Sequence, residues 1–480
     1  MILLLLACAR PAPEAPTPRA DVAYFILVDR FANGDPTNDP PGTDPSDPQA
    51  WHGGDLAGVH QNLHWIEDLG VTTVWLSPLM KTRYDTFFEW GAFHGYWVED
   101  HAQLDPAYGT EDELRALAKA CQERGISLIL DMVYNHSAMD GVLLQQKPHW
   151  YHPTGAIEDW DDPVELQNNR VHGLPDLDQD NPEVYAHLLE ASRYWLDLAQ
   201  PAGFRIDAVR HMHPSFLARL DQDLDDVWML AEIYDGDPEK LRRDWHEGAF
   251  ESVFDFPLHF AMVDTFCKGA PIGRLAATLS MDRIYDDPHA LFTFLDNHDR
   301  PRIASECDDV SVPLEFLFSV RGTPTLTYGT EVGLKGTHEP DNRADMRFDP
   351  PRAIGELAAK RSANPALSHG ESWISGLTDD TLRITREADG QRLTVVVTAT
   401  TLALEEGGPD KLTGTAEVDF APPEGFVVVG GGAELGNWNP EEGVQNARLE
   451  RGTVIEYKLV EVSGEQPIWP DGPNQTRLIR

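Results

Sequence analysis

Four short apolar segments of the sequence end in side chains that suit acid–base chemistry. They are residues 129–136, 203–211, 230–234 and 294–299, and in each a run of aliphatic residues leads to Asp, Glu, His, Asn or Arg. Cleavage of a glycosidic bond needs this kind of group, because one carboxyl group must be ionised and another protonated near neutral pH. The four segments therefore predict an acid–base sugar hydrolase.

The same segments indicate the elements that must position these side chains. Continuous apolar runs are typical of parallel strands buried on both faces, and in an eight-stranded α/β barrel the strand ends converge on one catalytic face. Residues 111–124 read as a helix between two strands, with Thr110 as N-cap and Gly125 as the stop. The sequence thus predicts an α/β protein with a (β/α)8 TIM barrel over residues 19–361. The expected strands are 22–28, 72–76, 127–131, 203–207, 227–232, 252–256, 290–295 and 323–328.

Two regions depart from this alternation. Residues 137–180 are rich in Pro, His, Trp and Asp and read as an insertion after the third strand, a B domain, because long non-periodic loops are usually functional or a subdomain. After residue 361 the pattern becomes β-rich. We expect a short β C domain at 362–411 and a β-sandwich at 412–480.

The charge of the chain limits its partners. Acidic residues outnumber basic ones 80 to 38, for a formal net charge of −42. Nucleic acid and anionic membranes would be repelled, so neither is expected as a partner. The charge suits a soluble extracellular protein, a bound divalent cation or a salty habitat. We expect a monomer.

The amino terminus and the cysteines bear on localisation. Residues 1–8 form a short apolar run that ends in Cys8, and residues 5–8 resemble a bacterial lipoprotein signal, followed by a Pro/Ala linker to residue 18. Lipidation of Cys8, an ordinary cleaved signal and an uninformative start all remain open. We expect an exported protein, either a lipoprotein of the outer membrane or cell surface or a secreted one. Cys121 reads as a core residue, whereas Cys267 and Cys307 could pair.

The four polar segments resemble the four signature regions of the α-amylase family of glycoside hydrolases. Residues 174–182 and 322–331 resemble two further regions of that family, and the match extends over roughly residues 21–400. The resemblance implies that Asp207 is the nucleophile, Glu232 the general acid/base and Asp299 the third carboxylate. It also implies a set of residues that contact the sugar, with Arg205 holding Asp207 ionised. These are His94, Tyr96, His136, Arg205, Arg210 and His298.

The resemblance further implies calcium as cofactor, with one central site and a second near the first strand. Oxygen donors from distant segments suit this hard cation. The central ligands would be Asn135, Asp176 and the carbonyl of His211. The second set would be Asn33, Asp35, Asn38, Asp39, the carbonyl of Gly53 and Asp55, although an Asx-rich turn without metal would look the same.

The end of the chain resembles a family-20 starch-binding module. Residues 426–439, 455–458 and 467–474 carry the resemblance, which implies a sugar site made by Trp438, Lys458, Trp469 and Asn474. The segment between residues 439 and 453 is short for such a module. A β-sandwich that has lost binding therefore remains an alternative.

Together these features predict an extracellular, retaining, endo-acting α-1,4-glucan hydrolase, an α-amylase, that acts on starch, glycogen or maltodextrin. A cyclodextrin glucanotransferase or maltogenic-type transglycosylase is the alternative, but those transferases carry Tyr or Phe four residues before the position of Asp176, where this chain has His172. A non-catalytic starch-binding surface lipoprotein is a remote third possibility.

Overall fold

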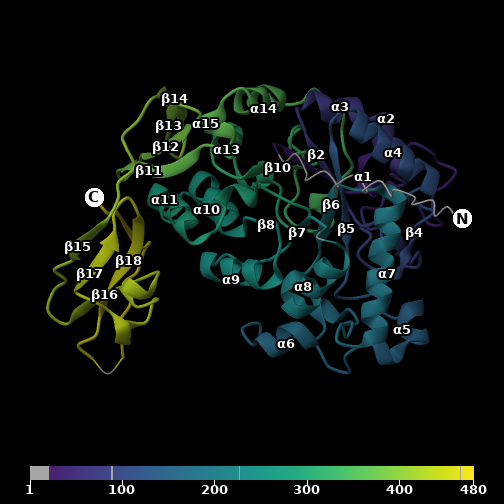
Figure 1. Ribbon diagram of the computed structural model, residues 1–480, viewed down its shortest axis with the longest axis horizontal. Helices are drawn as coiled ribbons and strands as arrows, with labels where there is room; N and C mark the ends of the chain where they lie inside the picture. Colours follow the sequence, from purple (N-terminus) through teal and green to yellow (C-terminus); the bar gives the residue numbers. More distant parts are fainter. Residues whose placement is uncertain (1–20, 88–89, 226, 465) are drawn as a thin grey trace, which may run out of the picture.

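Eight parallel strands form a closed barrel at the centre of the protein (Figure 1). The computed structural model describes residues 21–87, 90–225, 227–464 and 466–480. The barrel order is β1-β10-β9-β8-β7-β6-β5-β2. Barrel strands that are consecutive in the sequence therefore pair with each other, and β10 closes the barrel by pairing with β1. The strands are β1 (Ala23–Ile26), β2 (Thr73–Leu76), β5 (Ser127–Met132), β6 (Gly203–Ile206), β7 (Met229–Ala231), β8 (Ser252–Phe254), β9 (Leu291–Phe294) and β10 (Thr323–Thr327). The predicted barrel is confirmed.

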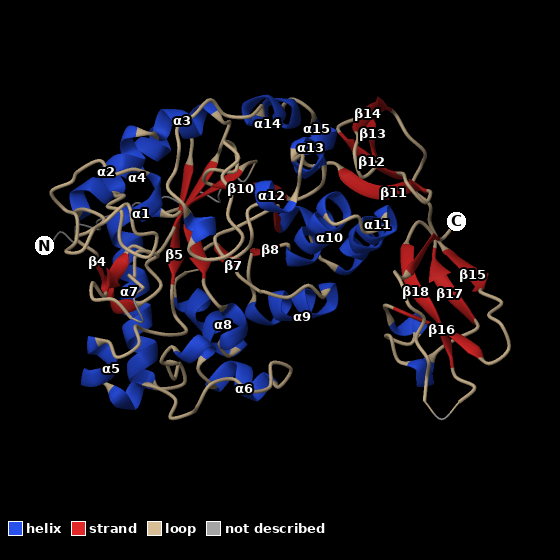
Figure 2. Ribbon diagram, turned by 180° about the vertical axis from the view of Figure 1, so that it is seen from behind, coloured by secondary structure: helices blue, strands red, loops and turns tan. Residues whose placement is uncertain are grey.

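Helices surround the strands on the outside, as Figure 2 shows. The expected helix at 111–124 is present as α4, and Thr110 and Glu113 form a capping box at its start. The helices outside the insertion are α1 (Val28–Phe31), α2 (Leu56–Gln61), α3 (Leu63–Asp68), α4 (Glu111–Glu123), α7 (Pro182–Ala199), α8 (Pro214–Asp223), α9 (Pro238–Gly248), α10 (Phe256–Cys267), α11 (Ile272–Ser280), α12 (Ile303–Glu306), α13 (Ser311–Ser319), α14 (Ile354–Ser362) and α15 (Pro365–Ser368).

Two additional segments are inserted between barrel strands and the helices that follow them. Between β5 and α7 the chain forms α5 (Val142–Gln146), α6 (Pro163–Asn168) and short 3-10 turns, which enclose a small apolar cluster of Ile157, Leu166 and Val171. Between β2 and α4 it forms an antiparallel hairpin, β3 (Met80–Thr82) and β4 (Val98–Leu104). The sequence analysis did not anticipate this hairpin.

From β11 (Glu371–Leu377) onward, the described residues form strands, turns and two short 3-10 helices, so this part of the chain is β-rich as expected. A four-stranded antiparallel sheet comes first, and two smaller sheets follow with a separate apolar core that includes Val418, Val428 and Leu449. The first sheet contains β11 (Glu371–Leu377), β12 (Leu382–Ala388), β13 (Gln391–Val397) and β14 (Leu402–Glu406). The smaller sheets contain β15 (Thr415–Asp419) with β17 (Asn446–Glu450), and β16 (Phe426–Gly430) with β18 (Val454–Glu461) and β19 (Gln475–Leu478). We call the part from β15 to β19 the C-terminal lobe.

The C-terminal lobe packs directly on the barrel helix α11 (Figure 1). The backbone N–H of Val454 donates to Ser280 Oγ at 2.6 Å, and Val454 belongs to the same apolar core as the barrel. At Gly273 a Cβ atom would lie 1.9 Å from Thr476 Oγ1, so only glycine allows this approach. The lobe is therefore held against the barrel by close contact.

A disulfide joins Cys267, at the end of α10, to Cys307, just after α12. The pairing that the sequence left open is thus present, and Cys121 is a buried free thiol. Among the described helices none is long and apolar enough to cross a bilayer. The signal and linker predicted at residues 1–18, including Cys8, lie outside the described residues.

Candidate active site

One buried guanidinium gathers the carboxyl groups at the ends of three neighbouring strands. Arg205 Nη1 lies 2.9 Å from Asp131 Oδ1 and 2.8 Å from Asp207 Oδ1. Its Nη2 lies 2.8 Å from Glu232 Oε1. Arg205 has no solvent exposure, and Asp207 and Glu232 are 8% and 9% exposed. The predicted nucleophile and general acid/base therefore share one cation.

The barrel register produces this arrangement. Asp131 of β5 stands opposite Arg205 of β6, and Leu230 of β7 stands opposite Arg205 on the other side. Side chains two apart on a strand share a face, so Arg205 and Asp207 point the same way. Glu232 follows β7 by one residue, at the same end of the barrel. All three strands thus deliver their polar groups to one point.

Glu232 is suited to carry a proton. Its burial, together with the charges of Asp207 and Asp299, raises its pKa to about 8 against the opposing effect of Arg205. The backbone N–H of Ala208 donates to Glu232 Oε2 at 3.1 Å and fixes the carboxyl group. Burial is the larger cause of this raised pKa, and the neighbouring carboxylates add to it.

Asp299 is held ionised on the opposite side of the site. Burial would raise its pKa, but His298 and Arg343 outweigh that effect and hold the pKa below its ordinary value. Arg343 Nη2 donates to Asp299 Oδ1 at 2.9 Å, and Arg343 Nε donates to the His298 carbonyl at 3.0 Å. The side chain of Asp299 is 37% exposed and so remains open to a ligand.

An aromatic wall stands beside these carboxylates. The Tyr96 hydroxyl donates to Asp131 Oδ2 at 2.9 Å and lies 2.9 Å from His298 Nε2, and the two rings are parallel to within 1°. The His94 ring also stacks on Tyr96, and His136 Nε2 lies 3.2 Å from the Tyr96 carbonyl. Burial lowers the pKa of His94, His136 and His298, so all three are neutral near pH 7. Neutral imidazoles can hydrogen-bond sugar hydroxyls.

Two residues of this site were not assigned from the sequence. Asp131 lies inside the segment 129–136, where a single charge in an apolar strand was a usable signal. Arg343 ends the short 3-10 helix η6 (Asp341–Arg343) after β10, a single turn that is too short to show a periodic pattern. Arg210, which was assigned to sugar binding, already has two partners in the protein. Its Nη1 donates to the Tyr234 carbonyl at 3.1 Å and pairs with Asp235 at 3.2 Å.

The central calcium ligands that the resemblance implied do come together. The side-chain oxygen of Asn135 lies 3.2 Å from Asp176 Oδ1 and 2.7 Å from the His211 carbonyl oxygen. These oxygens repel one another unless a cation lies between them or the amide turns so that its nitrogen donates to both. Asp176 Oδ2 also accepts from His152 Nδ1 at 2.6 Å, which orients the carboxylate. The donor set fits calcium.

The second set divides into two kinds of residue. Asp55 caps α2 by accepting from Gly58 N at 2.6 Å and also accepts from Asp35 N at 2.8 Å, while Asp35 accepts from Thr37 Oγ1 at 2.7 Å. These two carboxylates stabilise turns.

The remaining members of the second set surround Gly53. Asn33 donates to Asp39 Oδ1 at 2.8 Å, and both side chains would contact a Cβ at Gly53. Asn38 Oδ1 is buried and accepts no hydrogen bond from the residues that the structure describes. An orphaned oxygen beside a carboxylate fits a cation. Among the described residues no group of three His, Cys, Asp or Glu side chains is arranged for a metal, so a cation at either place would need amide and carbonyl oxygens in addition to the carboxylates.

The proposed sugar ligands of the C-terminal lobe lie around β18. Lys458 Nζ donates to the carbonyls of Pro470 and Gly472 at 3.2 and 3.1 Å and so holds the loop that carries Trp469. The Trp469 side chain is 41% exposed. Trp438 N donates to the Gly430 carbonyl at 2.9 Å, next to the residue paired with Lys458. Asn474 Nδ2 donates to Glu456 Oε1 at 3.0 Å.

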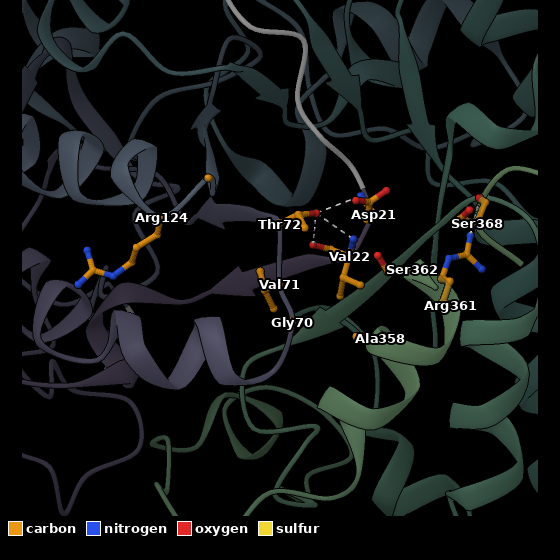
Figure 3. Close-up of a pocket in the computed structure, with 11 residues that line it drawn as sticks. Asp21, Val22, Gly70, Val71, Thr72, Arg124, Ala358, Arg361, Ser362 and Ser368 are labelled. Atoms are coloured by element: carbon orange, nitrogen blue, oxygen red, sulfur yellow. Dashed lines mark hydrogen bonds between the residues drawn. The ribbon is translucent and has the colours of Figure 1, made fainter. Parts of the chain in front are cut away.

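A cavity at the opposite end of the barrel has a different character. This cavity has a volume of about 170 Å³ and lies at the amino-terminal ends of β1 and β2. Thr72 Oγ1 accepts there from the backbone N–H groups of Asp21 and Val22 at 3.0 and 3.1 Å. Figure 3 shows the residues that line the cavity. Barrel enzymes carry their catalysis at the carboxyl ends of the strands. The candidate active site is therefore the group around Arg205.

Known proteins resemble this chain over most of its length. The family model described as alpha amylase, catalytic domain, matches residues 25–376. A β/α-amylase of Paenibacillus polymyxa is 31% identical over 73% of this chain, which spans 31% of that relative, and a cyclomaltodextrinase of a Bacillus species is 29% identical over 73% of this chain and 67% of its own length. The crystal structure of an α-amylase from Geobacillus thermoleovorans superposes with a TM-score of 0.73 at 29% identity and covers 92% of this chain and 99% of its own. The chain belongs to the α-amylase family of glycoside hydrolases.

Proposed function

We propose that the protein is a retaining, endo-acting α-1,4-glucan hydrolase that cleaves starch, glycogen and maltodextrins. The observation that carries this proposal is the pair of carboxyl groups on Arg205: Asp207 in an ion pair, and Glu232 buried with a pKa of about 8. Two carboxyl groups that share one guanidinium are close together. Retaining glycosidases need a short separation, about 5 Å, so that one carboxylate can attack directly.

The roles follow from these environments. Asp207, held by Arg205, attacks the anomeric carbon while protonated Glu232 gives its proton to the departing oxygen. Glu232, now ionised, takes a proton from the water that hydrolyses the glycosyl ester. Asp299 and the neutral His136 and His298 hold the sugar hydroxyls at the cleavage point.

Transfer to a sugar acceptor is the second candidate. A cyclomaltodextrin glucanotransferase of Klebsiella oxytoca is 26% identical over 77% of this chain. This similarity to a transferase supports transfer as the second candidate. His172, where those transferases carry Tyr or Phe, favours hydrolysis. Chromatography of the products from soluble starch and from cyclodextrin decides between the two, because cyclic products would contradict a hydrolase.

Substitution of the two carboxyl groups tests the hydrolytic mechanism. Glu232→Gln and Asp207→Asn should each lower kcat on a chromogenic maltoheptaoside by roughly 100- to 10,000-fold, because an amide neither donates the proton nor forms the ester. Circular dichroism checks the fold, and Glu123→Gln on the exposed face of α4 is the matched control. A folded Glu232→Gln protein with more than about a tenth of wild-type activity would refute the assignment.

We also propose that the C-terminal lobe binds starch through Trp438, Lys458, Trp469 and Asn474. Two observations support this: Trp469 is exposed, and Lys458 holds its loop by a hydrogen bond to the Pro470 carbonyl. Sugar C–H faces stack on aromatic rings that are held in place. Trp438→Ala combined with Trp469→Ala should weaken adsorption to starch granules by roughly 30-fold, since each ring contributes about 1–2 kcal/mol. A granule pull-down measures this, with Ile468→Ala as the exposed control. Equal binding by the double variant and wild type would mean a structural sandwich.

We further propose that the protein is exported, as a lipoprotein or in secreted form. The disulfide between Cys267 and Cys307 supports export, because such bonds persist in oxidising compartments. The mass of the amino-terminal peptide from the mature protein tests lipidation of Cys8. An unmodified peptide that begins at Met1 would contradict export by either route.

A further inference from the structure

Trp75 of β2 lies in the barrel interior, and the mechanism above gives it no role. It is 3% exposed, so its ring cannot stack on a sugar. The neighbours of β2 in the barrel are β1 and β5. The Trp75 ring nevertheless packs near Phe254 of β8, with 5.2 Å between the ring centroids, as well as 4.1 Å from the ring of Phe25 on β1. The indole therefore points across the interior of the barrel.

The indole makes two contacts with the group around Arg205. Its Nε1–H donates to Asp131 Oδ2 at 3.1 Å, and Arg205 Cζ lies 4.9 Å from the centroid of the ring. A cation over an indole face is attracted by the π electrons of the ring. Asp131 also accepts from Arg205 Nη1 at 2.9 Å and from the Tyr96 hydroxyl at 2.9 Å. Trp75 therefore contacts both members of the ion pair that Asp131 forms with Arg205.

The charge on Asp131 affects how strongly Arg205 stabilises the other carboxylates. Burial raises the pKa of Asp131 to about 7, against the opposing effect of Arg205, so its ionised form depends on the donors around it. An N–H group that donates to a carboxylate favours the ionised form. While Asp131 is ionised, it offsets part of the Arg205 charge. Once Asp131 is protonated, Arg205 stabilises ionised Glu232 more strongly, and the pKa of Glu232 falls.

We propose that Trp75 is a positioning residue, whose N–H group and ring face hold Asp131 and Arg205 in the arrangement that keeps Asp207 the nucleophile and Glu232 the acid. This inference rests on the proposed hydrolase function. An indole suits this task because it donates a hydrogen bond without ionising. It therefore supports the charged groups without exchanging protons with them.

Removal of the indole N–H group tests the inference. Trp75→Phe and Trp75→Tyr both keep an aromatic ring and lose that donor. We expect kcat on a chromogenic maltoheptaoside to fall by about tenfold with KM nearly unchanged, and the alkaline limb of the pH profile to move to lower pH by about half a unit. Trp195→Phe is the matched control, because Trp195 is 1% exposed and its Nε1 donates to the His101 carbonyl at 2.8 Å. The control should leave the alkaline limb in place.

Asp131→Asn separates a positioning role of Trp75 from a packing role. The amide carries no charge, so loss of the indole N–H group cannot change the charge at this position. In the Asp131→Asn protein, Trp75→Phe should therefore move the alkaline limb no further. A shift of equal size with and without Asp131→Asn would mean that Trp75 acts through packing alone, and the inference would fail.

The indole resonances of wild-type protein labelled with ¹⁵N-tryptophan provide a test without a substitution at Trp75. One of them should move as the pH passes through the alkaline limb, and Asp131→Asn should abolish that movement. The absence of any resonance that depends on Asp131 in this way would contradict the inference, whether or not the Trp75 variants fold.

The outcomes separate this inference from the proposed function. A Trp75→Phe protein that is folded by circular dichroism and keeps the wild-type alkaline limb would overturn the role of Trp75 and leave the hydrolase intact. Failure of the wild-type protein to cleave the maltoheptaoside would overturn the proposed function, and this inference with it.

Discussion

Arg205 determines how the catalytic residues divide their tasks. A buried cation needs compensation, and Asp131, Asp207 and Glu232 all lie within 3 Å of its nitrogens. Burial raises the pKa of Asp131 to about 7 and that of Glu232 to about 8, so these two groups readily accept protons. In the proposed mechanism, environment and not residue type thus makes one carboxyl group an acid and another a nucleophile.

The pH profile of the enzyme should report this environment. Glu232 acts as an acid only while protonated, so kcat/KM should fall as the pH rises through about 8. Asp299→Asn removes a negative charge that raises the pKa of Glu232, so the alkaline limb of the residual activity should move to lower pH. The shift is partial, because burial remains. Asp112→Asn, a highly exposed carboxylate on α4, should leave the limb in place. If the alkaline limb of the Asp299→Asn profile stays at the wild-type pH or moves to higher pH, the electrostatic account is contradicted.

The sequence predicted these residues to differing degrees, for a physical reason. Asp207 and Glu232 follow apolar strands directly and His298 follows β9 by four residues, and a polar group near the end of such a run is visible in one sequence. Arg343 reaches Asp299 from the single 3-10 turn η6, which is too short for a periodic pattern and has no side-chain capping hydrogen bond. Arg210 sits in a turn, so its direction depends on Asp235 and Tyr234, which no local pattern reveals.

At the scale of elements, the insertion contacts the barrel domain at several places, and one seam lies beside Asn135. His136 and Asp176 form an isolated β-bridge, which brings the end of the insertion beside Asn135. The three oxygens of Asn135, Asp176 and His211 join the chain after β5, the insertion and the turn after β6. The eight strands were predictable because both faces are buried. The hairpin β3–β4 was not, because its burial is irregular.

Calcium at this seam should stabilise the insertion. We expect chelation to lower the Tm and to speed proteolysis within residues 137–180, because a cation bound only by the folded state adds about 2.7 kcal/mol at 100 times its Kd. In Asp176→Asn the Tm should respond far less to calcium. Asp180→Asn, exposed nearby, is the control. Identical melting curves for calcium-loaded and carefully chelated wild-type protein would rule out a stabilising cation at either proposed site.

At the scale of the molecule, the C-terminal lobe is part of one body with the barrel. Helix α11 is buried along most of its length because the barrel lies on one side and strands β18 and β19 on another. The lobe keeps its own small core, and its contact with α11 fixes its orientation. A starch-binding surface on this lobe would accordingly have a set direction relative to the catalytic face.

Gly273 is the position where this docking can be tested. Gly273→Leu would force atoms into Thr476, whose Oγ1 lies 1.9 Å from the Cβ position, so the lobe should separate from α11. Leucine forms helices better than glycine by about 1 kcal/mol, so α11 itself should not weaken. We expect a larger radius of gyration by small-angle X-ray scattering and lower hydrolysis of starch granules, with adsorption retained. Thr476→Gly in the same chain should partly restore docking. The matched control for Gly273→Leu is Thr278→Leu on the exposed face of α11. Gly269→Leu would not serve, because Gly269 has a positive φ. An unchanged radius of gyration in Gly273→Leu would show that the lobe is not held through this contact.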